Sequence, residues 1–343
     1  MRQCKGAAPA INLILIFYLV CPCFCSAQGL QVFRIGTGGK TGVYYPIGKL
    51  IAEGVTCQFP GNGSSSSREK SNDRSFIAVA QNSAGSVENA SAVLCGETEA
   101  GMVQADVAFQ AYTSSGPFDG NPESGEIRAI ASLYPENFQI VVRKDAGIQK
   151  IEDLKGKRIS LDEQGSGTLS VMRIVLSACR MSEQDLMPVY LKPVFTKDKM
   201  ISGELQGFVM MAGLPMEAVL NLIPTGISLI SVPETVAWKI NSLYPHLFPG
   251  VIPANIYPGV PETQTVQVYA ILAVCSHTDP DLIYKITAAL WSDPVRSLLQ
   301  KGHPQAREIT LKKALTGLTI PLHKGAERFY RKMGMLNQGT SLP

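Results

Sequence analysis

Short apolar runs alternate along the chain with segments in which apolar residues recur every three or four positions. The runs predict strands, and the recurring spacing predicts amphipathic helices. The predicted strands are one that begins at Phe33 and others at residues 76–80, 101–103, 138–143, 158–161, 189–191, 208–211, 227–232 and 265–274. The predicted helices include residues 107–112, 150–154, 199–205, 216–223 and 233–244, and most of 279–335. Strands that alternate with helices predict a parallel α/β sheet, in which ligands bind at the carboxyl ends of the strands.

Three loops rich in glycine and hydroxyl residues each follow a predicted strand and open a predicted helix. The first lies at residues 36–42, the second follows Gln81 and has Ser86 as the expected helix cap, and the third is residues 165–168. Free N–H groups and the positive end of the helix dipole make such junctions suited to anions. Each loop taken alone is equally compatible with a plain strand-to-helix turn, and that alternative stays open.

The first loop matches two nucleotide-binding motifs only in part. A P-loop ending in Gly39-Lys40-Thr41 requires a glycine where Arg34 stands. A dinucleotide fingerprint starting at Gly36 requires a glycine at Thr41, and the acidic residue expected about 20 positions later is missing. The sequence therefore rejects both motifs.

The first 27 residues have the pattern of a secretory signal peptide. Arg2 and Lys5 precede an apolar run at residues 11–20, and residues 25–27 (CSA) form a small-residue cleavage site. The residue before Cys21 is not small, which favours simple cleavage over a lipid anchor. No later segment is long and apolar enough to span a bilayer. We therefore expect a soluble, periplasmic protein.

Composition excludes one class of partner. The chain of 343 residues is 45% hydrophobic and 17% charged, which is ordinary for a globular protein. Loss of residues 1–27 leaves 29 basic against 28 acidic residues, a net charge of +1. This balance provides no electrostatic basis for binding nucleic acid.

Four cysteines lie beyond the predicted signal peptide, at Cys57, Cys95, Cys179 and Cys275. Their wide spacing, with no C-x-x-C, argues against a metal site. An oxidising compartment permits one disulfide, but the spacing does not choose the partners. For most of these cysteines a buried single thiol is the expected state.

The motifs of common hydrolases are missing. All four histidines lie in the last third of the chain, away from the glycine-rich loops, and neither a zinc-protease nor a serine-hydrolase motif occurs. Acidic residues near the loops, at Asp106, Asp162 and Glu163, are expected as helix caps or solvated groups more than as general acids. The pattern favours capture of a ligand without turnover, so we expect no enzyme activity, metal or cofactor.

Seven runs, in order over nearly the whole chain, resemble the TAXI family (TRAP-associated extracytoplasmic immunogenic proteins). Its members are solute-binding subunits of tripartite ATP-independent periplasmic (TRAP) transporters. The matching runs are IGTGGKTGVYYPIGKLIA, QNSAGSVEN, GMVQADVAFQAY, LYPENFQIVVRKD, DLKGKRISLDEQGSGTLS, NIYPGV and IPLHKGAERFY.

The resemblance implies a type II periplasmic binding-protein fold, in which two α/β lobes enclose a ligand cleft and are joined by a hinge. On this chain the signal peptide would cover residues 1–27, lobe I residues 28–130 and 235–343, and lobe II residues 131–234. The ligand pocket that it implies draws on both lobes. Its residues would be Thr37, Gly38, Gly39, Tyr44, Asn82, Ser83, Ser86, Gln104, Asp106, Gly165, Ser166, Gly167, Thr168, Ala212 and Gly213.

The resemblance also implies a solute and a partner. The solute would be a small carboxylate, such as glutamate or a related amino acid or dicarboxylate, which a monomer delivers to the membrane subunits of a TRAP transporter. Thr168→Val and Gln104→Ala are expected to weaken its binding with little change in the unliganded melt. The alternatives are an exported sensory or interaction protein of the same fold and, less favoured, an exported hydrolase.

Two positions depart from the family pattern. Cys57 has no second cysteine in the loop that follows its helix, where residues 61–73 read GNGSSSSREKSND, a polar surface loop. Lys40 replaces a small residue, and its side chain either faces solvent or adds positive charge at the mouth of the cleft.

Overall fold

The computed structural model describes residues 30–59 and 75–337. The predicted signal peptide and the predicted loop at residues 61–73 lie outside this described part. The strands are β1 (Gln31–Gly36), β2 (Phe76–Gln81), β3 (Ala100–Gln104), β4 (Ile127–Arg143), β5 (Arg158–Ser160), β6 (Met187–Val189), β7 (Gly207–Ala212), β8 (Ile227–Ile230), β9 (Phe248–Ile252) and β10 (Thr263–Cys275). The α-helices are α1 (Tyr44–Cys57), α2 (Ser86–Leu94), α3 (Ala105–Thr113), α4 (Gly167–Ala178), α5 (Thr196–Ile201), α6 (Glu217–Leu220), α7 (Glu234–Leu243), α8 (Pro280–Leu290), α9 (Asp293–Gly302) and α10 (Lys324–Lys332).

One sheet runs through the described part of the chain, in the order β2-β1-β3-β10-β4-β7-β5-β6. Parallel pairs form both ends of this order, β2-β1-β3 and β7-β5-β6. The central strands β10 and β4 are antiparallel to each other and to their outer neighbours. β8 pairs with β4, and β9 pairs with β10. The sheet is therefore mixed, with parallel β/α units at each end.

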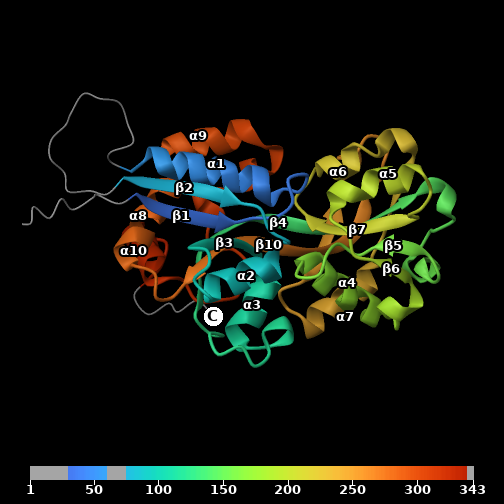
Figure 1. Cartoon of the computed structure of the whole chain (residues 1–343), viewed down its shortest axis with the longest axis horizontal. Coiled ribbons are helices and arrows are strands. Elements are labelled where there is room, and N and C mark those ends of the chain that lie inside the picture. The colour runs from blue at the N-terminus through green and yellow to red at the C-terminus, as the bar shows by residue number, and fades with distance from the viewer. Residues whose placement is uncertain (1–29, 60–74, 338–343) are drawn as a thin grey trace, which may run out of the picture.

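Two lobes lie at the two ends of this sheet (Figure 1). Lobe I contains β1–β3, α1–α3 and α8–α10, with α1 and α9 on one face of the sheet and α2 and α3 on the other. Lobe II contains β5–β8 and α4–α6, and α7 packs against its α4. The boundary predicted at residues 234/235 places α7 with lobe I. The residue limits of the lobes stay a proposal.

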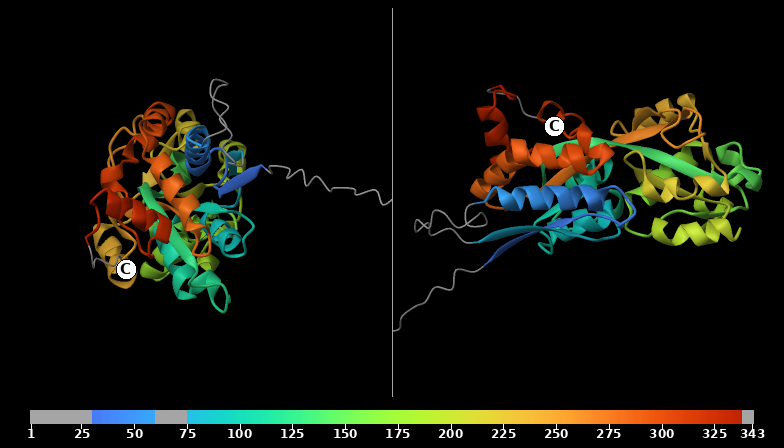
Figure 2. Two further views of the ribbon diagram at one scale, coloured as in Figure 1. Left: turned by 90° about the vertical axis from the view of Figure 1, so that its left-hand side faces the viewer. Right: turned by 90° about the horizontal axis from the view of Figure 1, so that it is seen from above.

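Two long strands join the lobes. β4 and β10 pair over nine positions, from Gln267 opposite Asn137 to Cys275 opposite Ile127, and most of their residues are buried. Seen from above, β4 passes without interruption from one lobe into the other (Figure 2). Its near-continuous apolar sequence is that of a strand covered on both faces.

Side chains of the C-terminal third hold the lobes together beside these strands. Gln305 accepts a hydrogen bond from the Leu214 N–H at 2.7 Å and donates one to the Pro135 carbonyl at 3.3 Å. The Tyr257 hydroxyl donates to Gln139 Oε1 at 2.6 Å and accepts from the Met216 N–H at 2.9 Å. Both residues thereby tie the segment after β7 to the middle of β4.

Most of the predicted strands and longer helices are confirmed, with local differences. β6 shares only Val189 with the strand predicted at residues 189–191, and the sheet is mixed where a parallel one was predicted. Residues 151–154 form a 3₁₀ turn, because four residues between turns cannot build a longer helix. Gly85, at φ 120°, is the N-cap of α2, and Ser86 is its first helical residue. The Ser86 hydroxyl is used elsewhere, as the acceptor of the Gln104 N–H at 3.1 Å.

The cysteines of the described part are unpaired, and the expectation of buried thiols is wrong for them. Cys57 and Cys95 are exposed at the ends of α1 and α2, and Cys179 and Cys275 are half-buried. Each lies at or just past the end of a helix or strand, where the chain reaches the surface. Within residues 30–59 and 75–337, no helix could cross a membrane and no cluster of three or more potential metal ligands occurs.

Candidate functional site

A pocket of about 590 Å³, its open mouth included, lies between the lobes. Lobe I contributes residues 38, 39 and 41–44 before and at the start of α1, residues 84–86 before and at the start of α2, and Gln104 at the end of β3. The loop before α4, the segment 192–194 and the end of β7 line the facing wall. The pocket thus occurs where the three glycine-rich loops were expected to meet. We call it the central pocket.

The first turns of α1, α2 and α4 all end at this pocket. Tyr44, Ser86 and Gly167 are the first residues of these helices, and all three line it. First-turn N–H groups have no partner within their own helix and carry the positive end of its dipole. The pocket is therefore supplied with backbone donors from both lobes.

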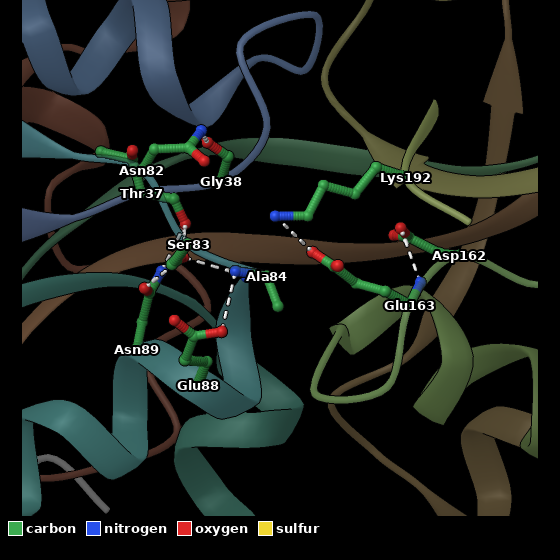
Figure 3. A network of polar contacts seen from close by, with 11 residues as sticks. Thr37, Gly38, Asn82, Ser83, Ala84, Glu88, Asn89, Asp162, Glu163 and Lys192 are labelled. Atoms are coloured by element: carbon green, nitrogen blue, oxygen red, sulfur yellow. Dashed lines mark hydrogen bonds and ion pairs between the residues drawn. The ribbon is translucent and has the colours of Figure 1, made fainter. Parts of the chain in front are cut away.

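Several predicted residues hold the first loop in shape instead of lining the pocket (Figure 3). Asn82 Nδ2 donates to the Gly38 carbonyl. The Thr37 carbonyl accepts from Ser83 Oγ at 2.9 Å and from Asn89 Nδ2 at 2.6 Å. The Thr37 side chain is buried and donates to the Gln81 carbonyl at 2.6 Å. This network fixes the β1 loop against the β2 loop.

A buried acid lies in the lining of the central pocket. Glu136, in the middle of β4, is 1% exposed, and its Oε2 accepts a hydrogen bond from the Tyr44 hydroxyl at 2.9 Å. Burial raises the pKa of Glu136 well above its usual value, and the nearby Asp106 carboxylate raises it further. Burial therefore favours the protonated form of Glu136, which can donate as well as accept a hydrogen bond.

Charged groups of lobe II reach into the cleft from the opposite wall (Figure 3). Lys192 Nζ lies 3.1 Å from Glu163 Oε1, with both side chains partly exposed. Asp162 accepts the Glu163 N–H at 2.9 Å, and burial raises the pKa of Asp162 to about 7. Among the described residues that line the pocket, Lys192 is the one lysine or arginine.

The two lobes touch beside the pocket. The Gly165 carbonyl of lobe II accepts hydrogen bonds from the backbone N–H groups of Val87 at 3.2 Å and Glu88 at 3.3 Å. The first turn of α2 therefore has two of its free donors occupied by the other lobe. Gly167 packs directly on the Gln104 amide, where a Cβ atom would overlap the side chain. The structure is a closed arrangement of the lobes.

The hydroxyl groups of the α4 loop are used by the fold. Ser166 Oγ accepts the Leu169 N–H at 3.1 Å and so caps α4. Thr168 Oγ1 accepts the Met211 N–H of β7 at 3.1 Å. Thr168 thus joins the start of α4 to the end of β7, and both line the pocket.

The structure divides the predicted pocket residues into two groups. Those that line the central pocket are Gly38, Gly39, Tyr44, Ser86, Gln104, Ser166, Gly167, Thr168 and Ala212. Those that lie outside its lining are Thr37, Asn82, Ser83, Asp106, Gly165 and Gly213. Lys40 is exposed and does not line the pocket either, so its side chain faces solvent.

Sequence reasoning missed Glu136 and Lys192 as lining residues. Glu136 had a usable signal, because it is an isolated acid inside the apolar run of β4. A charge at such a position is expensive unless it is neutral, paired or functional. Lys192 follows the short strand β6 in an ordinary turn, and no local pattern marks it.

Asp106 lies in a different place from the one predicted. It is the second residue of α3 and lines a separate, more open cavity on the far side of the Gly165 contact. The reason is helical geometry: Gln104 ends β3 facing the central pocket, and the α3 backbone then turns Asp106 away from it.

Comparison with solved structures identifies the class of fold. A protein from Bordetella bronchiseptica RB50 matches with a TM-score of 0.52 and 16% identity, over 89% of this chain and 82% of that one. MatC from Rhodopseudomonas palustris with bound malate matches with a TM-score of 0.50 and 12% identity, over 89% and 97%. The periplasmic aliphatic sulphonate binding protein SsuA from Escherichia coli matches with a TM-score of 0.48 and 13% identity, over 91% of this chain and 86% of that one. The first two matches confirm the α/β fold.

The family is shown by the sequence itself. A model of the NMT1-like family matches residues 35–334, which is most of the chain. The protein therefore belongs to the NMT1-like family.

Proposed function

We propose that this protein is an exported receptor that captures a small carboxylate in the central pocket and delivers it to the membrane subunits of a TAXI-type TRAP transporter. The observation that carries the proposal is the convergence of the α1 and α4 first turns, from the two lobes, on one pocket, with the start of α2 beside them. Backbone donors at helix N-termini bind carboxylates without an obligatory arginine. Residues 1–27 would direct export, and the receptor would act as a monomer without catalysing a reaction.

The charged side chains that line the central pocket narrow the range of solutes that would fit it. Lys192 is the basic group that faces the pocket, and Glu163 balances it at 3.1 Å. Glu136 and Asp162 add acidic groups whose pKa values are raised by burial. A solute with an ammonium group beside its carboxylate suits this lining, because the ammonium can be accepted by Glu163 and Asp162. Within the proposed class, glutamate and related amino acids are therefore favoured over plain dicarboxylates.

Lobe closure explains how such a site retains its solute. Walls from both lobes enclose the pocket, and the Gly165 contact to Val87 closes one side of it. Binding-protein folds open and close by hinge motion about the segments between lobes, which here are β4 and β10. A ligand that contacts both walls would favour the closed arrangement.

The test is a titration panel on the protein without residues 1–27. Glutamate, glutamine, 2-oxoglutarate, succinate and malate would be compared by thermal shift and calorimetry; malate is included because MatC binds it in the same fold. The proposal expects stabilisation by at least one of these acids, with glutamate ahead of succinate. If none of them shifts the melt or produces heat, the carboxylate assignment is wrong. Vesicles that contain the transporter subunits would then test delivery.

A further inference from the structure

A second cavity lies between the lobes, separated from the central pocket by the contact of Gly165 with α2. Its lobe I wall is the outer side of α3 and the turn at residues 115–117, and its lobe II wall is α4 together with residues 243–246 after α7. It is larger and more open than the central pocket. We call it the α3–α4 groove.

The floor of this groove contains a buried acid without a side-chain partner. Asp106 is 4% exposed, and no side chain of the described residues bonds its carboxylate oxygens; the nearest donors are the backbone N–H groups of Asp106 and Val107 in the first turn of α3. Gln110, one helical turn further along α3, also lines the groove and has a buried, unpartnered Oε1. Buried acceptors in folded proteins are normally satisfied, so two of them side by side point to a missing donor.

Aromatic side chains stand beside these acceptors. The rings of Phe109 on α3 and His246 on lobe II lie with their centroids 4.2 Å apart, which bridges the two walls. Tyr244 lines the same groove and is 41% exposed. Aromatic faces attract organic cations, and this attraction is strongest where water is excluded.

The charges around Asp106 favour a cation. Glu136 of β4 is near enough to Asp106 for the two carboxyl groups to interact, and burial favours the protonated form of Glu136. His246 is kept uncharged because burial lowers its pKa. Arg173 of α4 is held at 2.5 Å by Glu183, which balances its charge. The groove therefore contains one buried carboxyl group without a counter-ion, at Asp106.

We propose that the α3–α4 groove is a second binding site, which takes a small organic ammonium compound. Its ammonium group would lie against Asp106 and Gln110, and its methyl or methylene groups against Phe109, Tyr244 and His246. Because both lobes form the walls, occupancy of this site would favour the same closed arrangement as the solute in the central pocket. The site is independent of the identity of that solute.

Choline is the probe, and 3,3-dimethyl-1-butanol, its uncharged analogue, is the matched control compound. Calorimetry on the protein without residues 1–27 should show choline binding and at least tenfold weaker binding of the analogue. Asp106→Asn, which keeps the shape of the side chain, should lose choline affinity at least tenfold. Asp145→Asn, which removes a surface acid paired with Arg143 and outside the linings of both pockets, should bind choline as the wild type does.

Two further measurements keep the result clear if Asp106→Asn folds poorly. Phe109→Leu should weaken the binding of choline about five- to tenfold and leave the binding of the uncharged analogue unchanged. Choline affinity should also rise as pH increases through about 7, because burial raises the pKa of Asp106 to about 7 and its ionised form binds the cation. Equal binding of choline and the uncharged analogue, no choline binding at millimolar concentration, or unchanged affinity in Asp106→Asn would each overturn the proposal.

Discussion

The carbonyl oxygen of Gly165 in lobe II accepts the backbone N–H of Val87 in lobe I at 3.2 Å. This bond, with its neighbour to Glu88, occupies the first turn of α2 that would otherwise be free to bind a solute. It also divides the space between the lobes into the central pocket and the α3–α4 groove. Entry of any solute to the central pocket from that side requires the bond to break.

Gly167→Ala should open the lobes. A Cβ atom at this position overlaps the buried Gln104 amide of the other lobe, and overpacking of this kind costs about 1–3 kcal/mol. Small-angle scattering should therefore show a larger radius of gyration than in the wild type. Gly39→Ala is the matched control, since a Cβ atom there meets no atom within 4 Å. Adding Gln104→Ala should restore closure; an open double variant would refute the steric explanation.

Thr168→Val should lower the stability of the unliganded protein. Loss of the hydroxyl leaves the buried Met211 N–H without its acceptor at 3.1 Å, at a cost of about 1–3 kcal/mol. The sequence alone predicts little change in the unliganded melt, so this contact reverses that expectation. Urea denaturation measures the effect, and Thr168→Ser, which keeps the hydroxyl, is the control. Equal stability of the two variants would contradict the assigned contact.

Asp162→Asn should gain stability over the wild type as pH rises. The pKa of Asp162 is about 7 in the folded protein against an ordinary 3.8, so the folded state disfavours ionisation. The contribution of Asp162 to the free energy of unfolding is fully present below the ordinary pKa. It is lost as pH rises to about 7, and the free energy of unfolding falls by about 4 kcal/mol over this range. Asparagine cannot ionise, and it tolerates the φ of 66° at this position.

Urea melts at about pH 4.5 and about pH 7.5 test this dependence. The difference in free energy of unfolding between Asp162→Asn and the wild type should grow between these two values. Asp145→Asn is a control whose difference from the wild type should stay constant, because Arg143 lowers the pKa of Asp145 and its carboxyl group is ionised at both pH values. A difference for Asp162→Asn that stays constant with pH would mean that its carboxyl group is ionised throughout.

Lys192→Met removes the basic group of the central pocket. It should therefore weaken the binding of an anionic solute about tenfold, which corresponds to about 1.4 kcal/mol. Its partly exposed pair with Glu163 contributes less than about 1 kcal/mol to stability, so the melt should change little. Lys199→Met is the matched control, since its pair with Glu204 at 2.7 Å lies on the surface of the same lobe. Equal solute affinity in the two variants would remove Lys192 from the site.

Local sequence patterns were sufficient to predict an α/β fold and the strand-to-helix loops that meet at the pocket, and the family resemblance added the two lobes. The use of each side chain in those loops was harder to predict, because it depends on contacts between distant segments. Thr37 and Asn82 belong to polar loops, but their hydrogen bonds stay within lobe I. Asp106 lies two residues from Gln104 and faces another cavity. Lys192 enters the pocket from the segment that follows β6, the last strand in the order of the sheet.

The position of β10 in the sheet has a consequence for how the chain folds. β10 lies between β3 and β4, although more than 100 residues separate it from either. Until residue 275 has been synthesised, the sheet consists of two halves with open edges at β3 and β4. Open edges of this kind are prone to pair with other chains, and late long-range pairing slows folding. A chain that ends before residue 263 is therefore expected to aggregate and not to fold as a stable single lobe.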